Sequence, residues 1–137
     1  MNTVFLDTAF AISLSVKTDQ FHLKSALLAE QLRLQKTKML VTRGVLLEIG
    51  NSLSKIKYRA AALALLEALE SDPDVQIVEL VKSDYLAALE LFRQRPDKDW
   101  GLVDCISFVV MKRFNIFDAL TTDQHFVQAG FRALLQL

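Results

Sequence analysis

The sequence predicts an α/β fold of three layers, in which a central parallel sheet of about five strands lies between helices on both faces. Two observations lead to this prediction. Short apolar runs of strand length alternate with longer segments of helical length along the whole chain. These runs are apolar throughout rather than at alternate residues, which is typical of strands buried on both faces of a parallel sheet. The length of 137 residues is that of one domain, and we expect residues 1–137 to form it.

Short apolar runs mark the predicted strands, and segments with apolar residues at mostly helical spacing mark the helices. The expected order is a strand and two helices, repeated three times, followed by a strand, a helix and a last strand. In chain order the predicted elements are strand 4–6, helix 9–12, helix 21–35, strand 39–42, helix 45–53, helix 58–71, strand 75–80, helix 84–95, helix 104–114, strand 116–121, helix 123–129 and strand 131–135.

Capping and breaking residues support several of these boundaries. Thr8 is placed to cap the first helix, and Ser83 or Asp84 to cap the helix that runs to about residue 95. The segment 72–74, Asp-Pro-Asp, stops the preceding helix before the β-branched strand. Gly130 is expected to end the last helix as a C-cap residue.

The composition excludes several classes of protein. Sixteen Lys and Arg balance sixteen Asp and Glu, so the chain is not a strongly basic, sequence-indifferent binder of nucleic acid. The single cysteine, Cys105, excludes a disulfide framework and fits a reducing compartment. Residues 1–7 lack the basic region of a signal peptide, and no apolar run reaches the roughly 18 residues that span a bilayer. We therefore expect a soluble cytoplasmic protein.

Four acidic residues map to the edge of the sheet where parallel strands end, which is where such sheets bind ligands. Asp7 closes the first strand, Glu48 lies in the helix after the second, Asp104 begins a helix after a polar loop, and Asp123 follows the fourth strand. Helix capping is an alternative role for Asp7, Asp104 and Asp123. Glu48 fits that role less well, because it interrupts an apolar helix and has no basic residue three or four positions away.

Carboxylates that converge need a counter-charge. Two of them at roughly 4 Å repel by about 4 kcal/mol at an effective dielectric constant near 20, so a cluster requires protonation or a bound cation. Oxygen ligands favour Mg²⁺ or Mn²⁺ over zinc. Such ions activate water and stabilise the charge that develops when a phosphodiester is cleaved.

Three segments, together with Glu48, resemble the PIN-domain family. They are Val4–Thr8, Asp99–Ser107 and Ala119–Phe126. The resemblance covers the whole chain and is most specific in its C-terminal half, whereas no local motif surrounds Glu48. It implies a parallel sheet between helices and a metal-dependent nuclease that acts on RNA. By this match, Asp7, Glu48, Asp104 and Asp123 would form the acidic site that holds Mg²⁺ or Mn²⁺.

The resemblance also implies partners. Small stand-alone members of the family are mostly VapC-type toxins that are paired with an antitoxin and usually form dimers. Most apolar residues within 21–34 and 60–69 are expected to lie in the core. Some of them are expected to form a surface for such a partner. This chain departs from many members by carrying Gly101-Leu102-Val103, where they have Ser-Leu-Thr before the third acid. Asp99 belongs to the same motif, and its loop position makes it an auxiliary acid at best.

Other polar and aromatic residues near the acids have two interpretations each. Thr8 and Thr122 either cap helices or hold a carboxylate. His125 is expected at the surface, with a general-base role as the alternative. Trp100 either stacks on an RNA base or covers the core. Cys105 is interpreted as a small packing residue.

Charge is distributed unevenly along the chain. Residues 31–59 hold seven basic side chains against Glu48 alone, and residues 60–79 hold five acids and no base. We interpret the first segment either as a solvated helix face or as a basic rim that attracts phosphates, which Arg93, Arg95 and Lys98 would extend. The acidic segment is expected away from RNA.

Two other functions compete with a ribonuclease. A receiver-like phosphoacceptor domain would need an acidic pair after the first strand and a late lysine, and the chain has one acid there and no lysine after Lys112. A catalytically silent PIN-like domain would bind protein or RNA without turnover, and the presence of all four acids speaks against it.

Overall fold

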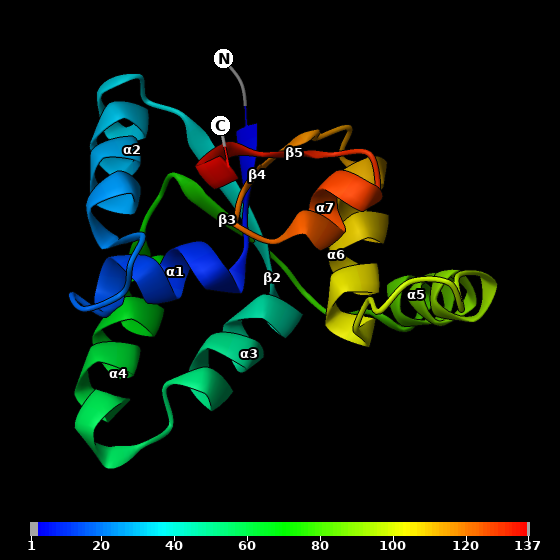
Figure 1. Ribbon diagram of the computed structural model, residues 1–137, viewed down its shortest axis with the longest axis horizontal. Helices are drawn as coiled ribbons and strands as arrows, with labels where there is room; N and C mark the ends of the chain where they lie inside the picture. The colour runs from blue at the N-terminus through cyan, green and yellow to red at the C-terminus, as the bar shows by residue number, and fades with distance from the viewer. Residues whose placement is uncertain (1–2, 137) are drawn as a thin grey trace.

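The computed structural model describes residues 3–136, and Figure 1 shows their arrangement. The order of strands and helices agrees with the order predicted from the sequence. The elements are β1 (Thr3–Leu6), α1 (Thr8–Ser15), α2 (His22–Leu34), β2 (Lys38–Thr42), α3 (Arg43–Ser52), α4 (Ile56–Ser71), β3 (Val75–Val78), α5 (Lys82–Gln94), α6 (Leu102–Arg113), β4 (Asp118–Leu120), α7 (Gln124–Gln128), β5 (Arg132–Ala133) and a 3-10 turn, η1 (Leu134–Gln136). Met1 and Asn2 of the N-terminal segment discussed above lie outside the described residues.

The five strands form one parallel sheet, as predicted, and their order in the sheet is β3-β2-β1-β4-β5. In Figure 1, α1, α2 and α4 lie on one side of the sheet, and α5, α6 and α7 lie on the other. Helix α3 lies at the carboxyl end of the strands and contacts α1, α4 and α6. The first strand is therefore central, and the residues that follow β1, β2 and β4 face the same end of the molecule.

Several predicted boundaries are wrong in detail. The fourth strand begins at Asp118 rather than 116, because the Ile116 amide donates back to the Met111 carbonyl at 2.9 Å in the turn that ends α6, where Asn115 has a left-handed conformation (φ 57°). The last strand ends at Ala133, where the chain turns into η1. Neither Ser83 nor Asp84 caps α5, which begins at Lys82. Asp84 instead accepts a hydrogen bond of 2.6 Å from Arg113.

An aromatic cluster fixes α6 and α7 against the sheet. Phe108 of α6 packs edge-on against Trp100 and against Phe126 of α7, with ring centroids 5.0 Å apart in both pairs. Phe126 also contacts Phe5 of β1, and Phe131 closes the cluster. Such aromatic pairs contribute roughly 0.5–1.5 kcal/mol each beyond the area they bury. The cluster thus holds the beginnings of α6 and α7 next to the end of β1.

Helix α7 ends as the sequence predicts. Gly130 adopts φ 98°, a conformation that suits glycine, and the Phe131 amide donates back to the Phe126 carbonyl at 2.9 Å. This turn directs the chain into β5.

Part of the predicted apolar core is exposed. Leu27 and Leu34 of α2 are 73% and 67% exposed, and Leu63 of α4 is 54% exposed. Among residues 3–136, no helix has both the length and the hydropathy needed to cross a membrane.

Candidate metal centre

Asp7 is the most buried of the four predicted site acids, with 6% of its surface exposed. It follows β1 directly, and its Oδ2 accepts a hydrogen bond of 2.6 Å from the hydroxyl of Thr121. Burial raises the pKa of Asp7 to about 7, and the nearby charges of Asp104 and Glu48 add to this effect. The hydrogen bond from Thr121 opposes the rise. Asp7 makes no side-chain capping bond to α1, so the capping interpretation is wrong for this residue.

Glu48 lies in the middle of α3 and is partly buried. Its Oε1 accepts a hydrogen bond of 2.6 Å from the hydroxyl of Thr8, the first residue of α1. Thr8 therefore holds a carboxylate, and its predicted role as a cap is wrong. This contact links the helix after β2 to the helix after β1. It is the reason why a single acid on an apolar helix is tolerated at this place.

Asp104 and Asp123 meet at a histidine. Asp104 stands in the first turn of α6, and its Oδ2 lies 3.0 Å from Nδ1 of His125. Asp123 precedes α7, and its Oδ1 accepts a hydrogen bond of 2.8 Å from the His125 amide. One potential ligand atom from each of these three residues lies within 4.8 Å of the others. His125 is only 25% exposed, so its predicted surface position is wrong.

Both acids also support the helices that carry them. The Gly101 amide donates to Asp104 Oδ2 at 3.2 Å, and Asp123 caps α7. The capping interpretation is therefore correct for these two residues, but it does not exhaust their contacts. The structure brings all four predicted acids to the same end of the sheet, since Asp7 interacts electrostatically with both Glu48 and Asp104.

This set of side chains fits a divalent cation. Asp104, Asp123 and His125 offer ligand atoms close to one another, whereas Asp7 and Glu48 lie outside this group of three. The carboxylate oxygens are donors that Mg²⁺ and Mn²⁺ accept. In the region the structure describes, Glu48, Asp104 and Asp123 each keep one carboxylate oxygen that accepts no hydrogen bond. A cation would also supply the positive charge that a buried Asp7 needs in order to ionise.

Four residues that lie close to the site acids in the sequence do not join them in the structure. Asp99 is exposed and is not among the three residues grouped around His125. Trp100 is buried and donates from Nε1 to Gln128 at 3.0 Å, which supports the interpretation that it covers the core. Burial raises the pKa of the Cys105 thiol, which disfavours a nucleophilic thiolate. Thr122 makes no side-chain hydrogen bond among residues 3–136.

The basic segment 31–59 and the acidic segment 60–79 form ion pairs with each other and are not separate charged surfaces. Arg43 pairs with Glu70 and, at 2.7 Å, with Glu79, and Lys38 pairs with Asp74 at 2.6 Å. A basic rim formed by the whole segment 31–59 is therefore wrong. Arg93, Arg95 and Lys98 also pair with nearby acids, so they extend no rim either. Lys55, Lys57 and Arg59 form no ion pair within the described chain.

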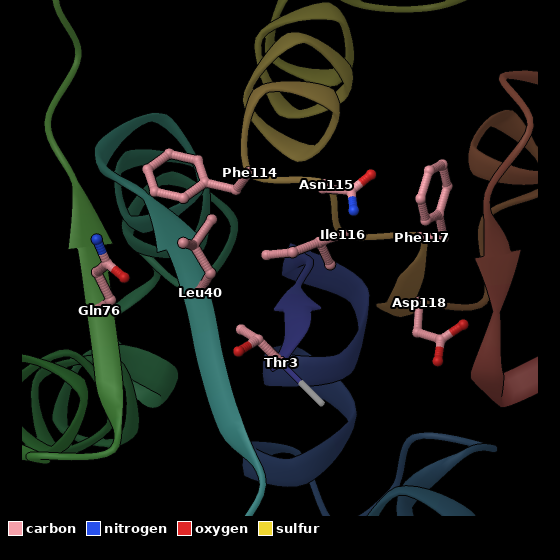
Figure 2. Close-up of a pocket in the computed structure, with 8 residues that line it drawn as sticks. All are labelled: Thr3, Leu40, Gln76, Phe114, Asn115, Ile116, Phe117 and Asp118. Atoms are coloured by element: carbon pink, nitrogen blue, oxygen red, sulfur yellow. The ribbon is translucent and has the colours of Figure 1, made fainter. Parts of the chain in front are cut away.

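A cavity of about 410 Å³ lies elsewhere, at the opposite end of the sheet. Figure 2 shows that its lining comes from the beginnings of β1 and β4, with Thr3 and Asp118, and from the loop with Asn115. None of the four acids lines it. The candidate site is therefore marked by converging carboxylates and not by this hollow.

Thr121 is not among the residues singled out from the sequence, and His125 is expected there only at the surface or as a general base. Thr121 holds Asp7, whereas the sequence analysis names its neighbour Thr122. The register of β1 and β4 contains the missing signal. Leu6 pairs with Leu120, so the next residues, Asp7 and Thr121, lie side by side. For His125 the signal is the cap of α7: the His125 amide donates to Asp123, and the His125 ring contacts Asp104 of α6.

Comparisons with known proteins identify the family and the fold of the chain. The family model described as PIN domain matches residues 4–132. The chain is similar to VapC20 of Mycobacterium tuberculosis, a sarcin-ricin loop cleaving toxin, with 25% identity over 94% of this chain and 96% of that chain and a TM-score of 0.83. It shares a fold with VapBC2 from Rickettsia felis bound to a promoter DNA fragment, at 16% identity, 93% coverage of each chain and a TM-score of 0.68. A search of curated protein sequences gave no match.

Proposed function

Because the chain belongs to the PIN-domain family, we propose that it is a metal-dependent ribonuclease that hydrolyses RNA phosphodiester bonds. The observation that carries the proposal is the meeting of Asp7, Glu48, Asp104 and Asp123 at one end of the sheet, each held by at least one hydrogen bond. These donors come from α1, from the segment after β4 and from α7. Such an arrangement costs repulsion between carboxylates, and it is stable with a bound cation.

The four acids would hold Mg²⁺ or Mn²⁺. When bound, such an ion lowers the pKa of the attacking water and offsets the negative charge that develops on the phosphate. A bound cation would favour the ionised form of Asp7, whose pKa burial raises to about 7 in the metal-free protein. Thr8, Thr121 and His125 orient the carboxylates and leave their other oxygens available.

RNA would enter along α3, which carries Glu48, and along the start of α4, which follows α3 in the chain. Lys55, Lys57 and Arg59 begin α4, directly after α3, and no acidic partner neutralises them within residues 3–136. Arg59 also donates to the Ser54 carbonyl and Lys57 lies over the ring of Tyr58, but neither charge is neutralised by these contacts. Such cations attract the phosphate backbone of a nucleic acid. This short group of cations replaces the broader basic rim.

The similarity to a toxin supports a role as the toxin of a toxin–antitoxin pair in the cytoplasm. In this role the chain would bind a cognate antitoxin and form a homodimer. Leu23, Leu27 and Leu34 of α2, together with Ile56 and Leu63 of α4, are exposed. Apolar surface of this kind is suited to a protein partner.

The decisive experiment is an RNA cleavage assay with the purified protein in Mg²⁺, in Mn²⁺ and in chelator. An RNA that contains the sarcin-ricin loop is the first substrate to use, given the activity named for the similar toxin. We expect cleavage that requires a divalent ion and falls by about 100-fold or more in Asp7→Asn, since even partners of metal ligands contribute 10–100-fold. Cleavage that persists in chelator or in Asp7→Asn would refute the proposal. RNA binding without turnover in any divalent ion would favour the silent alternative.

A further inference from the structure

His125 contacts two of the site acids through two different donors. Its backbone amide donates to Asp123 Oδ1 at 2.8 Å, and its ring nitrogen Nδ1 lies 3.0 Å from Asp104 Oδ2. A carboxylate only accepts hydrogen bonds, so Nδ1 carries the hydrogen in this contact. One residue thus joins an acid at the start of α6 to an acid at the start of α7.

The contact with the ring determines which oxygen of Asp104 remains free. Asp104 Oδ2 accepts from the Gly101 amide at 3.2 Å as well as from His125. Two donors occupy this oxygen, and Oδ1 accepts no hydrogen bond in the described part of the chain. A carboxylate fixed in this way presents a single oxygen to a cation and does not have to be ordered when the cation binds.

The position of the imidazole is itself fixed. The following residue, Phe126, is completely buried among Phe5 and Phe108, and α7 is capped by Asp123. The ring of His125 is 25% exposed, and Asp104 is 18% exposed. Nδ1 also lies 3.5 Å from Asp123 Oδ1, so the ring lies beside both acids.

We propose that His125 is a positioning residue, whose Nδ1–H orients Asp104 for the divalent cation of the site. This inference rests on the proposed function, because it assumes that the four acids hold a cation. It assigns the imidazole to Asp104 and not to the metal. A direct metal ligand would have to give up the hydrogen on Nδ1 or use Nε2 instead.

Two amide substitutions separate these roles. In asparagine the amide nitrogen stands as far from Cβ as Nδ1 does in histidine, so His125→Asn keeps a donor for Asp104. In glutamine the amide stands where Nε2 would be, so His125→Gln serves as the matched control with a misplaced donor. His125→Ala removes the ring but retains the backbone amide that holds Asp123.

The experiment measures Mn²⁺ affinity directly, by electron paramagnetic resonance of free Mn²⁺ in titrations of the full chain. We expect His125→Ala and His125→Gln to bind Mn²⁺ about 10–100-fold more weakly than the wild type, and His125→Asn to stay within about threefold. RNA affinity in chelator should not change in any variant. His22 contacts the Ser13 carbonyl in another part of the fold, so His22→Ala should leave Mn²⁺ affinity unchanged.

The outcomes separate the two proposals. If the wild type binds Mn²⁺ and His125→Ala binds it equally well, this inference is overturned while the proposed function stands. Equal losses in the Ala, Asn and Gln variants would show a direct ligand and would also overturn it. If the wild type binds no divalent ion, the proposed function itself fails.

Discussion

The hydroxyl of Thr121 donates a hydrogen bond of 2.6 Å to Oδ2 of Asp7, although 114 positions separate the two residues. The same hydroxyl accepts a hydrogen bond of 2.9 Å from the Asp123 amide. Thr121 therefore connects the first acid of the site to the backbone of the last one. Its place at the end of β4, beside the end of β1, makes both contacts possible.

Removal of this hydroxyl is expected to weaken both stability and cation binding. Thr121→Val keeps the shape of the side chain but leaves buried Asp7 without its donor, which costs about 1–3 kcal/mol. Urea denaturation measures the loss, and a Mn²⁺ titration measures the affinity. Thr122→Val is the matched control, because the Thr122 side chain makes no hydrogen bond within residues 3–136. A loss of equal size in both variants would contradict this prediction.

The stability of the protein should depend on the protonation of Asp7. Its pKa is about 7 in the folded state and near 3.8 when exposed, so the folded state binds the proton more tightly. The stabilisation of the folded state by protonated Asp7 is therefore fully present below pH 4 and is lost as the pH rises toward 7. The free energy of unfolding falls by an amount on the order of 4 kcal/mol over this range. Asp7→Asn removes this titration and can still accept from Thr121.

We therefore expect Asp7→Asn to gain stability relative to the wild type between pH 5 and pH 8, as measured by urea denaturation in chelator. Added Mn²⁺ should stabilise the wild type at pH 8, and it should stabilise the variant much less. A difference between the two proteins that stays constant across this pH range would show that Asp7 does not titrate there.

Asp104 and Asp99 offer a paired test of the acidic site. Both stand near the start of α6, but only Asp104 contacts His125, whereas Asp99 is exposed. Asp104→Asn should lower cleavage by about 100-fold or more, since the loss of a ligand exceeds the 10–100-fold loss of its partners. Asp99→Asn should stay within about twofold. A large loss in Asp99→Asn would place that acid in the site after all.

Substitution of Trp100 is expected to lower the free energy of unfolding, because this side chain belongs to the core. Trp100→Ala opens a cavity beside Phe108 and removes the bond to Gln128, at a cost of about 3–5 kcal/mol. Trp100→Phe retains an aromatic ring and should cost about 1–2 kcal/mol. If Trp100 served as a base-stacking platform, Trp100→Ala would instead lose RNA affinity while its unfolding free energy stayed close to that of the wild type, and Trp100→Phe would keep most of that affinity.

The sequence predicts the order of all the strands and helices, because strand-length and helix-length apolar patterns are local properties. It misplaces their ends where a turn decides, as at Asn115, where the turn that ends α6 delays β4 until Asp118. The 3-10 turn after Ala133 is missed for a similar reason, since its leucines suit a strand equally well.

Asp7, Asp104 and Asp123 can be singled out because each stands at the end of a strand or the start of a helix. Glu48 can be singled out because it interrupts an apolar helix. The partners of these acids cannot be singled out in this way, because a partner depends on which strands become neighbours. Thr121 reaches Asp7 only because β4 lies beside β1, and Thr8 reaches Glu48 only because α1 packs on α3. The contact of His125 with Asp104 cannot be predicted from spacing, since it depends on the packing of α7 against α6.

The central place of β1 has a consequence for synthesis of the protein. This strand is made first, yet its second neighbour, β4, comes only after residue 117 has been added. Until then Asp7 lacks Thr121, and the growing chain has neither Asp123 nor His125. The proposed acidic site therefore cannot assemble, and no activity that depends on it can begin, until most of the chain has left the exit tunnel. The order of the strands thus delays the activity to the end of translation.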